Sequence, residues 1–267
     1  MRLVKVNPYQ RLECDTGLII PELPDMVGPE DVLIVAPLHN SGSKNDATGA
    51  FHPGARAFSR VHGLDQSAEF RWDNRLGRYA QADAVIREME RREPKVLAAF
   101  CHGYQHGVQF GLRSPGHRFR TEIDVSYWER FITALSTHNA AGYTAPVVVL
   151  YACSTGDDPD DDPDTAPGSG DGSFADLLRD ALCDRWATQC RVMAHTTAGH
   201  TWLNPQVKMF DGDGDVAGGV GAELLAVDGD DEGESFREES RKLAALLRTD
   251  WAFTFPFRPI DAIRSDL

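Results

Sequence analysis

We expect an α/β fold with a mostly parallel central sheet and helices on both faces, because buried strands alternate with amphipathic helices along the chain. Three short apolar runs rich in β-branched residues predict buried parallel strands at 31–38, 95–101 and 145–153. A weaker run at 190–196 predicts a fourth strand. Parallel neighbours of this kind need crossover connections, which are normally helical.

Three segments have the periodicity of helices with one apolar face, and they are 75–93, 126–139 and 173–186. In the first segment the apolar residues near one face are Ala80, Ala84, Ile86 and Met89. Ser173 is placed to cap the third helix. Strands and helices in this order predict ligand binding at the carboxyl ends of the strands.

The length and composition favour one domain. A chain of 267 residues with 42% hydrophobic content can bury a single sizeable core. We expect one domain over residues 31–267, preceded by an N-terminal extension over residues 1–30 that packs on it.

The net charge of −14 disfavours nucleic acid and anionic membrane surfaces as partners, since both repel a negatively charged protein. The first thirty residues contain no apolar run of signal-peptide length, and no stretch approaches the roughly 20 apolar residues of a membrane span. We therefore expect a soluble, cytoplasmic protein.

Five cysteines occur without CxxC spacing, and they are Cys14, Cys101, Cys153, Cys183 and Cys190. An odd, scattered set predicts neither a disulfide framework nor a zinc ribbon. In a reducing compartment these thiols are free, and one of them can serve as a nucleophile.

Two predicted strands end in residues that together could catalyse acyl transfer. The strand at 95–101 is followed by His102 and Gly103, and the strand at 145–153 ends in Cys153. If these strands are neighbours, their ends lie about 4.8 Å apart. The histidine can then act as general base for the thiol, and the N–H groups of Gly103 and Cys153 can bind a developing oxyanion.

A structural explanation exists for each residue alone, since a cysteine at a strand end is commonly a small buried hydrophobe. We assign that structural role to Cys101, whose side chain alternates with that of His102 and so packs under the sheet. The combination of His102 and Cys153 on consecutive core strands, 51 residues apart, favours the catalytic interpretation.

The motifs FCHG at 100–103 and YACSTG at 151–156 resemble the two signatures of the caspase-like cysteine peptidases. In form they are closest to the bacterial gingipain, CHAT and metacaspase types. The resemblance implies a caspase-hemoglobinase-like fold and a cysteine endopeptidase with His102 and Cys153 as the dyad. It also implies that Gly103 contributes to the oxyanion hole.

The resemblance further places substrate-binding residues near the nucleophile and after the strand at 190–196. His200 and Trp202 are the candidates for the pocket wall, and Tyr151 occupies the position two residues before the nucleophile. Caspases have Gln there and metacaspases Asp, so the specificity of neither family transfers. The substrate class it implies is a protein or peptide, and an activating protein partner is a further expectation.

Two alternative functions remain open. A metal-dependent hydrolase would use histidines from a loose set, His102, His106, His117, His195 and His200, although no HExxH spacing occurs. A catalytically inactive caspase-like binding module would keep the fold without the chemistry. We expect no metal and no cofactor; the run Asp211–Asp215 only partly matches a calcium loop, since Val216 and Ala222 replace its glycine and glutamate.

The segment at 157–172 predicts a mobile acidic loop. Together with Gly156 it contains seven aspartates, three prolines and four glycines, which disfavour helix and strand. It is either a passive solubilising tether or a gate that is cut or ordered during activation, with calcium as one neutralising cation.

Overall fold

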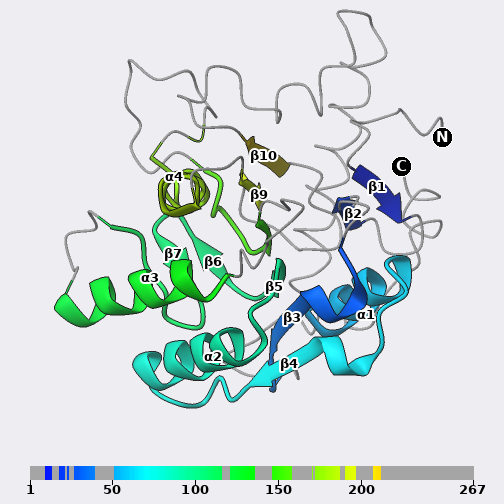
Figure 1. Cartoon of the computed structure of the whole chain (residues 1–267), viewed down its shortest axis with the longest axis horizontal. Helices are drawn as coiled ribbons and strands as arrows, with labels where there is room; N and C mark the ends of the chain where they lie inside the picture. Colours follow the sequence, from blue (N-terminus) through cyan, green and yellow to red (C-terminus); the bar gives the residue numbers. More distant parts are fainter. Residues whose placement is uncertain are drawn as a thin grey trace, which may run out of the picture.

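The computed structural model of the chain confirms an α/β architecture with a six-stranded, mostly parallel sheet (Figure 1). The residues that the structure describes are 10–13, 18–21, 23, 27–39, 51–115, 121–135, 146–157, 170, 172–186, 190–196 and 207–211. The strands, in spatial order, are β10 (Val207–Asp211), β9 (Arg191–His195), β8 (Val147–Tyr151), β5 (Val96–Phe100), β3 (Val32–Pro37) and β4 (Glu69–Trp72). All neighbouring pairs are parallel except β10 with β9.

The four expected strands are confirmed as β3, β5, β8 and β9. The sequence patterns did not predict β4 and β10, at the two edges of the sheet. Phe210 and Asp211 belong to β10, although the acidic run from 210 to 219 predicted a turn. The pairing of Phe210 with Val192 on β9 supplies the backbone partners that local composition does not reveal.

In the described part of the chain, four helices cover the two faces of the sheet (Figure 1). They are α1 (Phe51–Val61), α2 (Arg78–Arg92), α3 (Glu122–Ala134) and α4 (Phe174–Trp186). Buried side chains form two clusters, one shared by the sheet and α1, the other shared by the sheet and α2, α3 and α4. We call these sides the α1 face and the three-helix face.

Strand alternation assigns each side chain at the sheet centre to one of these faces. On β5, Ala98 and Phe100 pack on the α1 face, whereas Ala99 packs on the three-helix face. On β8, Val149 and Tyr151 pack on the α1 face in the same way. Neighbouring strands therefore present matched rows of side chains.

The helix boundaries follow from capping and from contacts with the sheet. Helix α3 begins at Glu122 because Thr121 accepts a hydrogen bond from the Asp124 N–H and Asp124 accepts one from the Thr121 N–H. Asp124 also pairs with Arg78 of α2 at 2.9 Å, which joins the two helices. This start lies four residues before the expected one.

The buried face of α2 differs from its expected composition. Ala80 is exposed and Ala84 is half-buried, whereas Ile86 and Met89 are buried as expected. Gln81 is buried instead, because its side chain accepts a hydrogen bond from the Trp72 indole at 3.0 Å.

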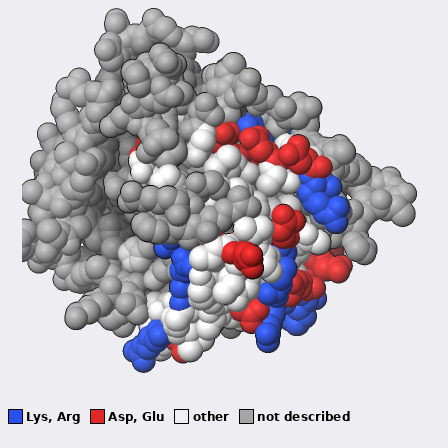
Figure 2. Space-filling view, turned by 90° about the vertical axis from the view of Figure 1, so that its left-hand side faces the viewer, with Lys and Arg blue, Asp and Glu red and all other residues white. Residues whose placement is uncertain are grey.

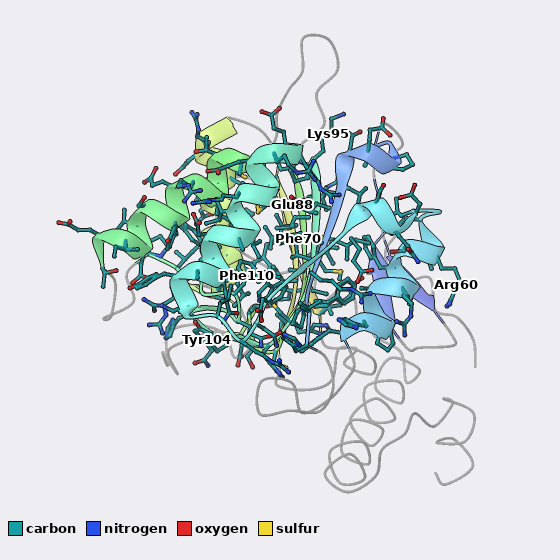
Figure 3. The ribbon with its side chains drawn as sticks, turned by 90° about the horizontal axis from the view of Figure 1, so that it is seen from below. Arg60, Phe70, Glu88, Lys95, Tyr104 and Phe110 are labelled. Carbon is teal, nitrogen blue, oxygen red and sulfur yellow. The ribbon has the colours of Figure 1, made fainter. Side chains whose placement is uncertain are left out.

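At the amino end of the sheet, main-chain and ionic contacts join Lys95 to Asp31. The Lys95 ammonium lies 3.0 Å from the Asp31 carboxylate, and the Lys95 N–H donates to the Asp31 carbonyl. Figure 3 shows Lys95 at this end and Tyr104 at the opposite, carboxyl end of the sheet. Short 3₁₀ turns, η1 (Pro29–Asp31) and η2 (Gln66–Ala68), precede β3 and β4.

The first thirty residues, expected as an extension that packs on the domain, include an antiparallel hairpin of β1 (Gln10–Glu13) and β2 (Leu18–Pro21). Strand β2 lies against α1, and Leu23 and Val27 pack on the α1 face. Residues 212–267 of the expected domain lie outside the described residues.

The exposed side of α2 and α3 has acidic and basic side chains next to one another (Figure 2). Arg130 of α3 reaches Asp83 and Glu90 of α2 at 3.0 and 2.8 Å. Such exposed pairs each contribute little to stability. Among the described residues, no helix has both the length and the apolar character that a membrane span requires.

Candidate functional site

The pairing of β5 with β8 brings the two motifs together. Phe100 is the partner of Tyr151 at the last paired position, and the Cys101 N–H donates to the Tyr151 carbonyl at 3.3 Å. His102 and Cys153 each follow two residues after that last pair. The His102 ring contacts Phe51 on the α1 face, and continued alternation from Tyr151 predicts the same side for Cys153.

A pair of buried aromatic rings supports these strand ends from below. The rings of Phe100 and Tyr151 stack with centroids 4.3 Å apart and an interplanar angle of 18°. Tyr151 is 0% exposed, and burial raises the pKa of its hydroxyl well above the ordinary value. The structure thus places Tyr151, expected as a substrate-binding residue, in the core beneath the site.

Gly103 lies directly against the backbone of the Cys153 turn. A Cβ atom at Gly103 would be 2.6 Å from the Cys153 carbonyl oxygen and 2.7 Å from side-chain atoms of Ala152 and Thr155. Any side chain would therefore push the His102 strand away from Cys153. The close approach explains why glycine follows the histidine.

A tight hairpin fixes the main chain of His102. Its strands are β6 (Gly103–Tyr104) and β7 (Gly107–Val108). The Gln109 N–H donates to the His102 carbonyl at 2.9 Å, and the Gln109 side-chain oxygen accepts from the His102 N–H at 3.3 Å.

The hairpin also orients the Gly103 N–H. In an antiparallel ladder, residue pairs that exchange hydrogen bonds alternate with pairs that do not. His102 and Gln109 form a hydrogen-bonded pair, so Gly103 and Val108 form a non-hydrogen-bonded pair. The Gly103 N–H points away from β7, as a donor to an oxyanion must. The role of Gly103 in an oxyanion hole stays a prediction.

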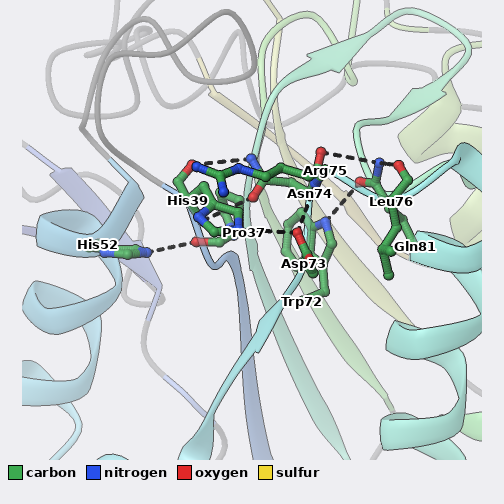
Figure 4. Close-up of polar contacts among 9 residues, drawn as sticks. All are labelled: Pro37, His39, His52, Trp72, Asp73, Asn74, Arg75, Leu76 and Gln81. Carbon is green, nitrogen blue, oxygen red and sulfur yellow. Dashed lines mark hydrogen bonds and ion pairs between the residues drawn. The ribbon is translucent and has the colours of Figure 1, made fainter.

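The start of α1 provides a wall beside the histidine. The rings of Phe51 and His102 meet edge to face, with centroids 4.9 Å apart and an interplanar angle of 87°. His52 ties this helix to the end of β3, since its Nε2 lies 2.7 Å from the Pro37 carbonyl oxygen (Figure 4).

A second set of bonds links the ends of β3 and β4 next to this wall. Asn74 accepts from the His39 N–H at 2.9 Å and donates to the His39 carbonyl at 3.1 Å (Figure 4). The His39 ring also lies 3.2 Å from the Asp73 carboxylate. These contacts hold the carboxyl ends of both strands in register.

The chain turns sharply after Cys153. Ser154 adopts a left-handed conformation with φ of 54°, which is unfavourable for a residue with a Cβ atom. The Thr155 hydroxyl donates to the Ala152 carbonyl at 3.0 Å, and the Gly156 N–H donates to the His195 carbonyl at 2.8 Å. Backbone strain held by its surroundings is characteristic of functional turns.

The first turn of α4 binds both loops of the site. The Phe174 N–H donates to the Gln105 carbonyl of the hairpin at 3.0 Å, and the Ala175 N–H donates to the Thr155 carbonyl at 2.8 Å. Free N–H groups at a helix start are thereby satisfied by loop carbonyls. Ser173 caps the helix as expected, since its hydroxyl accepts from the Asp176 N–H at 3.2 Å.

The described cysteines differ in exposure. Cys153 is half-buried, whereas Cys101, Cys183 and Cys190 are buried. Burial raises the pKa of the Cys101 thiol to about 12, so this thiol stays protonated at neutral pH. Cys101 packs on the three-helix face, which confirms its expected structural role.

The remaining residues named from the sequence do not gather at one place. His106 lies at the turn of the hairpin, and His195 is 2% exposed, with its ring 6.1 Å from that of Tyr151. Among the described residues, no three His, Cys, Asp or Glu side chains are grouped so that they could hold a metal ion. Residues outside the description are His117, His200, Trp202, residues 158–169 and 171 of the acidic loop, and the partial calcium-loop match after Asp211.

Phe51 and Gln109 are part of the site but were not predicted from the sequence. Phe51 is remote from His102 along the chain, and no pattern in the sequence links the two. Gln109 is separated from His102 by a hairpin whose only local signals are Gly103 and Gly107.

Comparisons with protein-family models, with curated proteins and with solved structures found no match to this chain.

The exposure of the thiols predicts their order of reaction. Under limiting iodoacetamide, Cys153 should be alkylated before Cys101, Cys183 and Cys190, because the thiolate must be accessible to react. Peptide mapping after brief labelling measures this order, and Cys14→Ser removes the cysteine outside the described residues. Faster alkylation of a buried cysteine in the folded protein would contradict the assignment.

The left-handed turn predicts opposite effects of two substitutions. Ser154→Gly should keep or raise the free energy of unfolding, whereas Ser154→Val should lower it by about 1–2 kcal/mol. Denaturant titration measures both changes. Glu93, which has φ of 48° at the end of α2, is the matched control: Glu93→Val should destabilise similarly but leave Cys153 reactivity unchanged. Equal stability of Ser154→Gly and Ser154→Val would show that the turn is unstrained.

His52 predicts a pH-dependent contribution to stability. Burial lowers the pKa of His52 below its ordinary value of 6.5, although the hydrogen bond to Pro37 partly opposes this. The unfolded chain therefore takes up the proton first as the pH falls, so the contribution is complete above about pH 6.5 and is lost below it. His52→Gln should lose less stability than the wild type between pH 7.5 and 5.5 in urea titrations. If His52→Gln and the wild type lost the same amount of stability between these pH values, this role of His52 would be refuted. His106→Gln is the control.

Proposed function

We propose that this protein is a cysteine endopeptidase of the caspase-like type, with a caspase-hemoglobinase-like fold and His102 and Cys153 as its catalytic pair. One observation carries the proposal: both residues follow two positions after Phe100 and Tyr151, the last paired residues of adjacent parallel strands, whose side chains share the α1 face. This arrangement meets the requirement of thiol catalysis, a base next to a nucleophile at an accessible strand end.

Acylation begins when the His102 imidazole accepts the proton of the Cys153 thiol. The thiolate attacks the carbonyl carbon of the peptide bond, and the carbonyl oxygen becomes an oxyanion. The Gly103 N–H, which points away from β7, donates to this oxyanion. Collapse of the intermediate breaks the C–N bond, and His102 passes its proton to the leaving amine.

Deacylation uses the same residues in reverse. His102 accepts a proton from water, and the resulting hydroxide attacks the thioester carbonyl. The second intermediate releases the carboxylic acid, and the proton returns to the Cys153 sulfur. The two half-reactions leave the enzyme unchanged and use no external reductant or oxidant.

The local structure supports this chemistry in two ways. The left-handed residue Ser154 turns the chain away immediately after Cys153, which leaves the thiol half-buried rather than inside the core. The edge-to-face contact between the Phe51 and His102 rings restricts the rotation of His102. Helix α4 holds the loops of both residues through Phe174 and Ala175, so their separation is set by a rigid element.

Removal of either catalytic group tests the proposal. Cys153→Ala should abolish cleavage of a quenched-fluorescent peptide library, and His102→Ala should lower kcat by at least about 100-fold. His106→Ala is the matched control, because it alters the same hairpin without touching the proposed dyad. Circular dichroism should show folded protein for all three variants.

A retained rate in Cys153→Ala would overturn the assignment of the nucleophile. If chelators then abolished that rate, and stoichiometric metal were lost on mutation of His102, His195 or His200, the activity would belong to a metal-dependent hydrolase. A protein that binds peptides but never cleaves them would be an inactive binding module.

A further inference from the structure

The hairpin that carries His102 is extended by a third, short strand segment over residues 112–114. The Val108 N–H donates to the Leu112 carbonyl at 3.0 Å, and the Ser114 N–H donates to the His106 carbonyl at 2.9 Å. Gly107 is the bridge partner of Arg113. The carboxyl end of the sheet therefore bears a small antiparallel layer in the order β6, β7 and residues 112–114.

The two faces of this layer differ in character. Val108 and Leu112, paired with each other, are each 1% exposed and pack in the core of the three-helix face. Alternation places the residues of the opposite face together, and they are His102, Tyr104, Gly107, Gln109 and Arg113. Arg113 thus shares a face with the proposed catalytic histidine.

Gly107 leaves room for an aromatic ring between these residues. A Cβ atom at Gly107 would lie 3.0 Å from the Tyr104 hydroxyl oxygen, so the ring of Tyr104 extends across the glycine. Since Gly107 pairs with Arg113, this ring lies between the His102 strand and the arginine. Tyr104 is 38% exposed, so part of its side chain is accessible to solvent on that face.

The guanidinium of the half-buried Arg113 has contacts that differ from those of the buried Arg179. Its Nε atom is buried and has no hydrogen-bond partner, and no ion pair joins it to another described residue. Buried Arg179, in contrast, lies 2.7 Å from Asp176. A desolvated donor without a partner destabilises the folded protein, and an anionic ligand that accepts its hydrogen bond removes this cost.

The order of the strands places Arg113 on a defined side of the reaction. His102 immediately precedes β6, and Arg113 lies two strand positions away, about 10 Å at ordinary spacing. The Cys101 N–H bonds to β8 and the His102 carbonyl bonds to Gln109 beyond β7, so the Cys153 turn that follows β8 lies on the other side of β6. His102 therefore lies between the thiol and the arginine. Because His102 delivers its proton to the leaving amine, Arg113 faces the part of the substrate that follows the cleaved bond.

We propose that Arg113 binds a carboxylate of the substrate within about three residues after the cleaved bond, and this inference rests on the proposed peptidase function. An extended peptide advances about 3.3 Å per residue, which sets that range. A guanidinium binds carboxylates through paired, charge-assisted hydrogen bonds. The carboxylate belongs either to an Asp or Glu side chain or to the free end of the peptide.

Matched peptides separate these two sources. One series has Asp or Glu at the first, second or third position after the cut with an amidated end, and its isosteric series has Asn or Gln. A third series has neutral side chains after the cut and ends in a free carboxylate one to three residues after it. We expect kcat/KM to be about 10–100-fold higher for one carboxylate series than for its neutral counterpart.

Arg113→Gln should remove this preference and leave cleavage of the neutral peptides unchanged. Arg113→Lys should restore part of it, because lysine keeps the charge but not the paired geometry. Arg87→Gln, an exposed arginine of α2, is the control. Equal loss on acidic and neutral peptides, or no preference in the wild type, would overturn the inference while leaving the peptidase function intact.

Peptide binding to the Cys153→Ala variant measures the role of Arg113 without turnover. The affinity of this variant for acidic and neutral peptides, measured by fluorescence anisotropy, should differ by a similar factor, and Arg113→Gln should abolish the difference. Equal affinities for both would refute the role of Arg113. Carboxylate-dependent binding without any cleavage by the wild type would support Arg113 and refute the peptidase function.

Discussion

The parallel pairing of β5 with β8 is the constraint on which the candidate site depends. It aligns Phe100 with Tyr151, whose stacked rings fill the α1 face beneath the strand ends. The same register sets His102 beside Cys153 and lets Gly103 lie on the Cys153 carbonyl. A shift of one residue in either strand would turn one of the two side chains to the opposite face.

Helix α4 couples the two loops that this pairing brings together. Its first N–H groups bind carbonyls of the His102 hairpin and of the Cys153 turn, and these bonds replace the intrahelical partners that a helix start lacks. The acidic segment between Cys153 and α4 ends at this helix start, where Gly172 donates to the buried Asp176. Helix α4 therefore connects the loops that follow the two proposed catalytic residues.

Two features that cost free energy lie close to the carboxyl strand ends, whereas the left-handed Glu93 ends α2 away from the site. The left-handed Ser154 and the unpartnered Nε of Arg113 both cost free energy in the folded protein. The surrounding strands, in contrast, are fully buried, and the ionic contacts of α2 and α3 are paired. This distribution is expected where a stable scaffold holds a reactive or ligand-binding surface.

Local periodicity and composition are sufficient to predict the α/β class, four strands of the sheet, three helices and the opposite orientations of Cys101 and His102. The pairing of β5 with β8, the contact of Phe51 with His102 and the burial of Tyr151 are features of the folded chain that the sequence patterns do not predict. The tertiary structure also supplied β4 and β10, whose short edge strands have little pattern of their own. These features depend on contacts between segments far apart in the chain, which no local period of the sequence encodes.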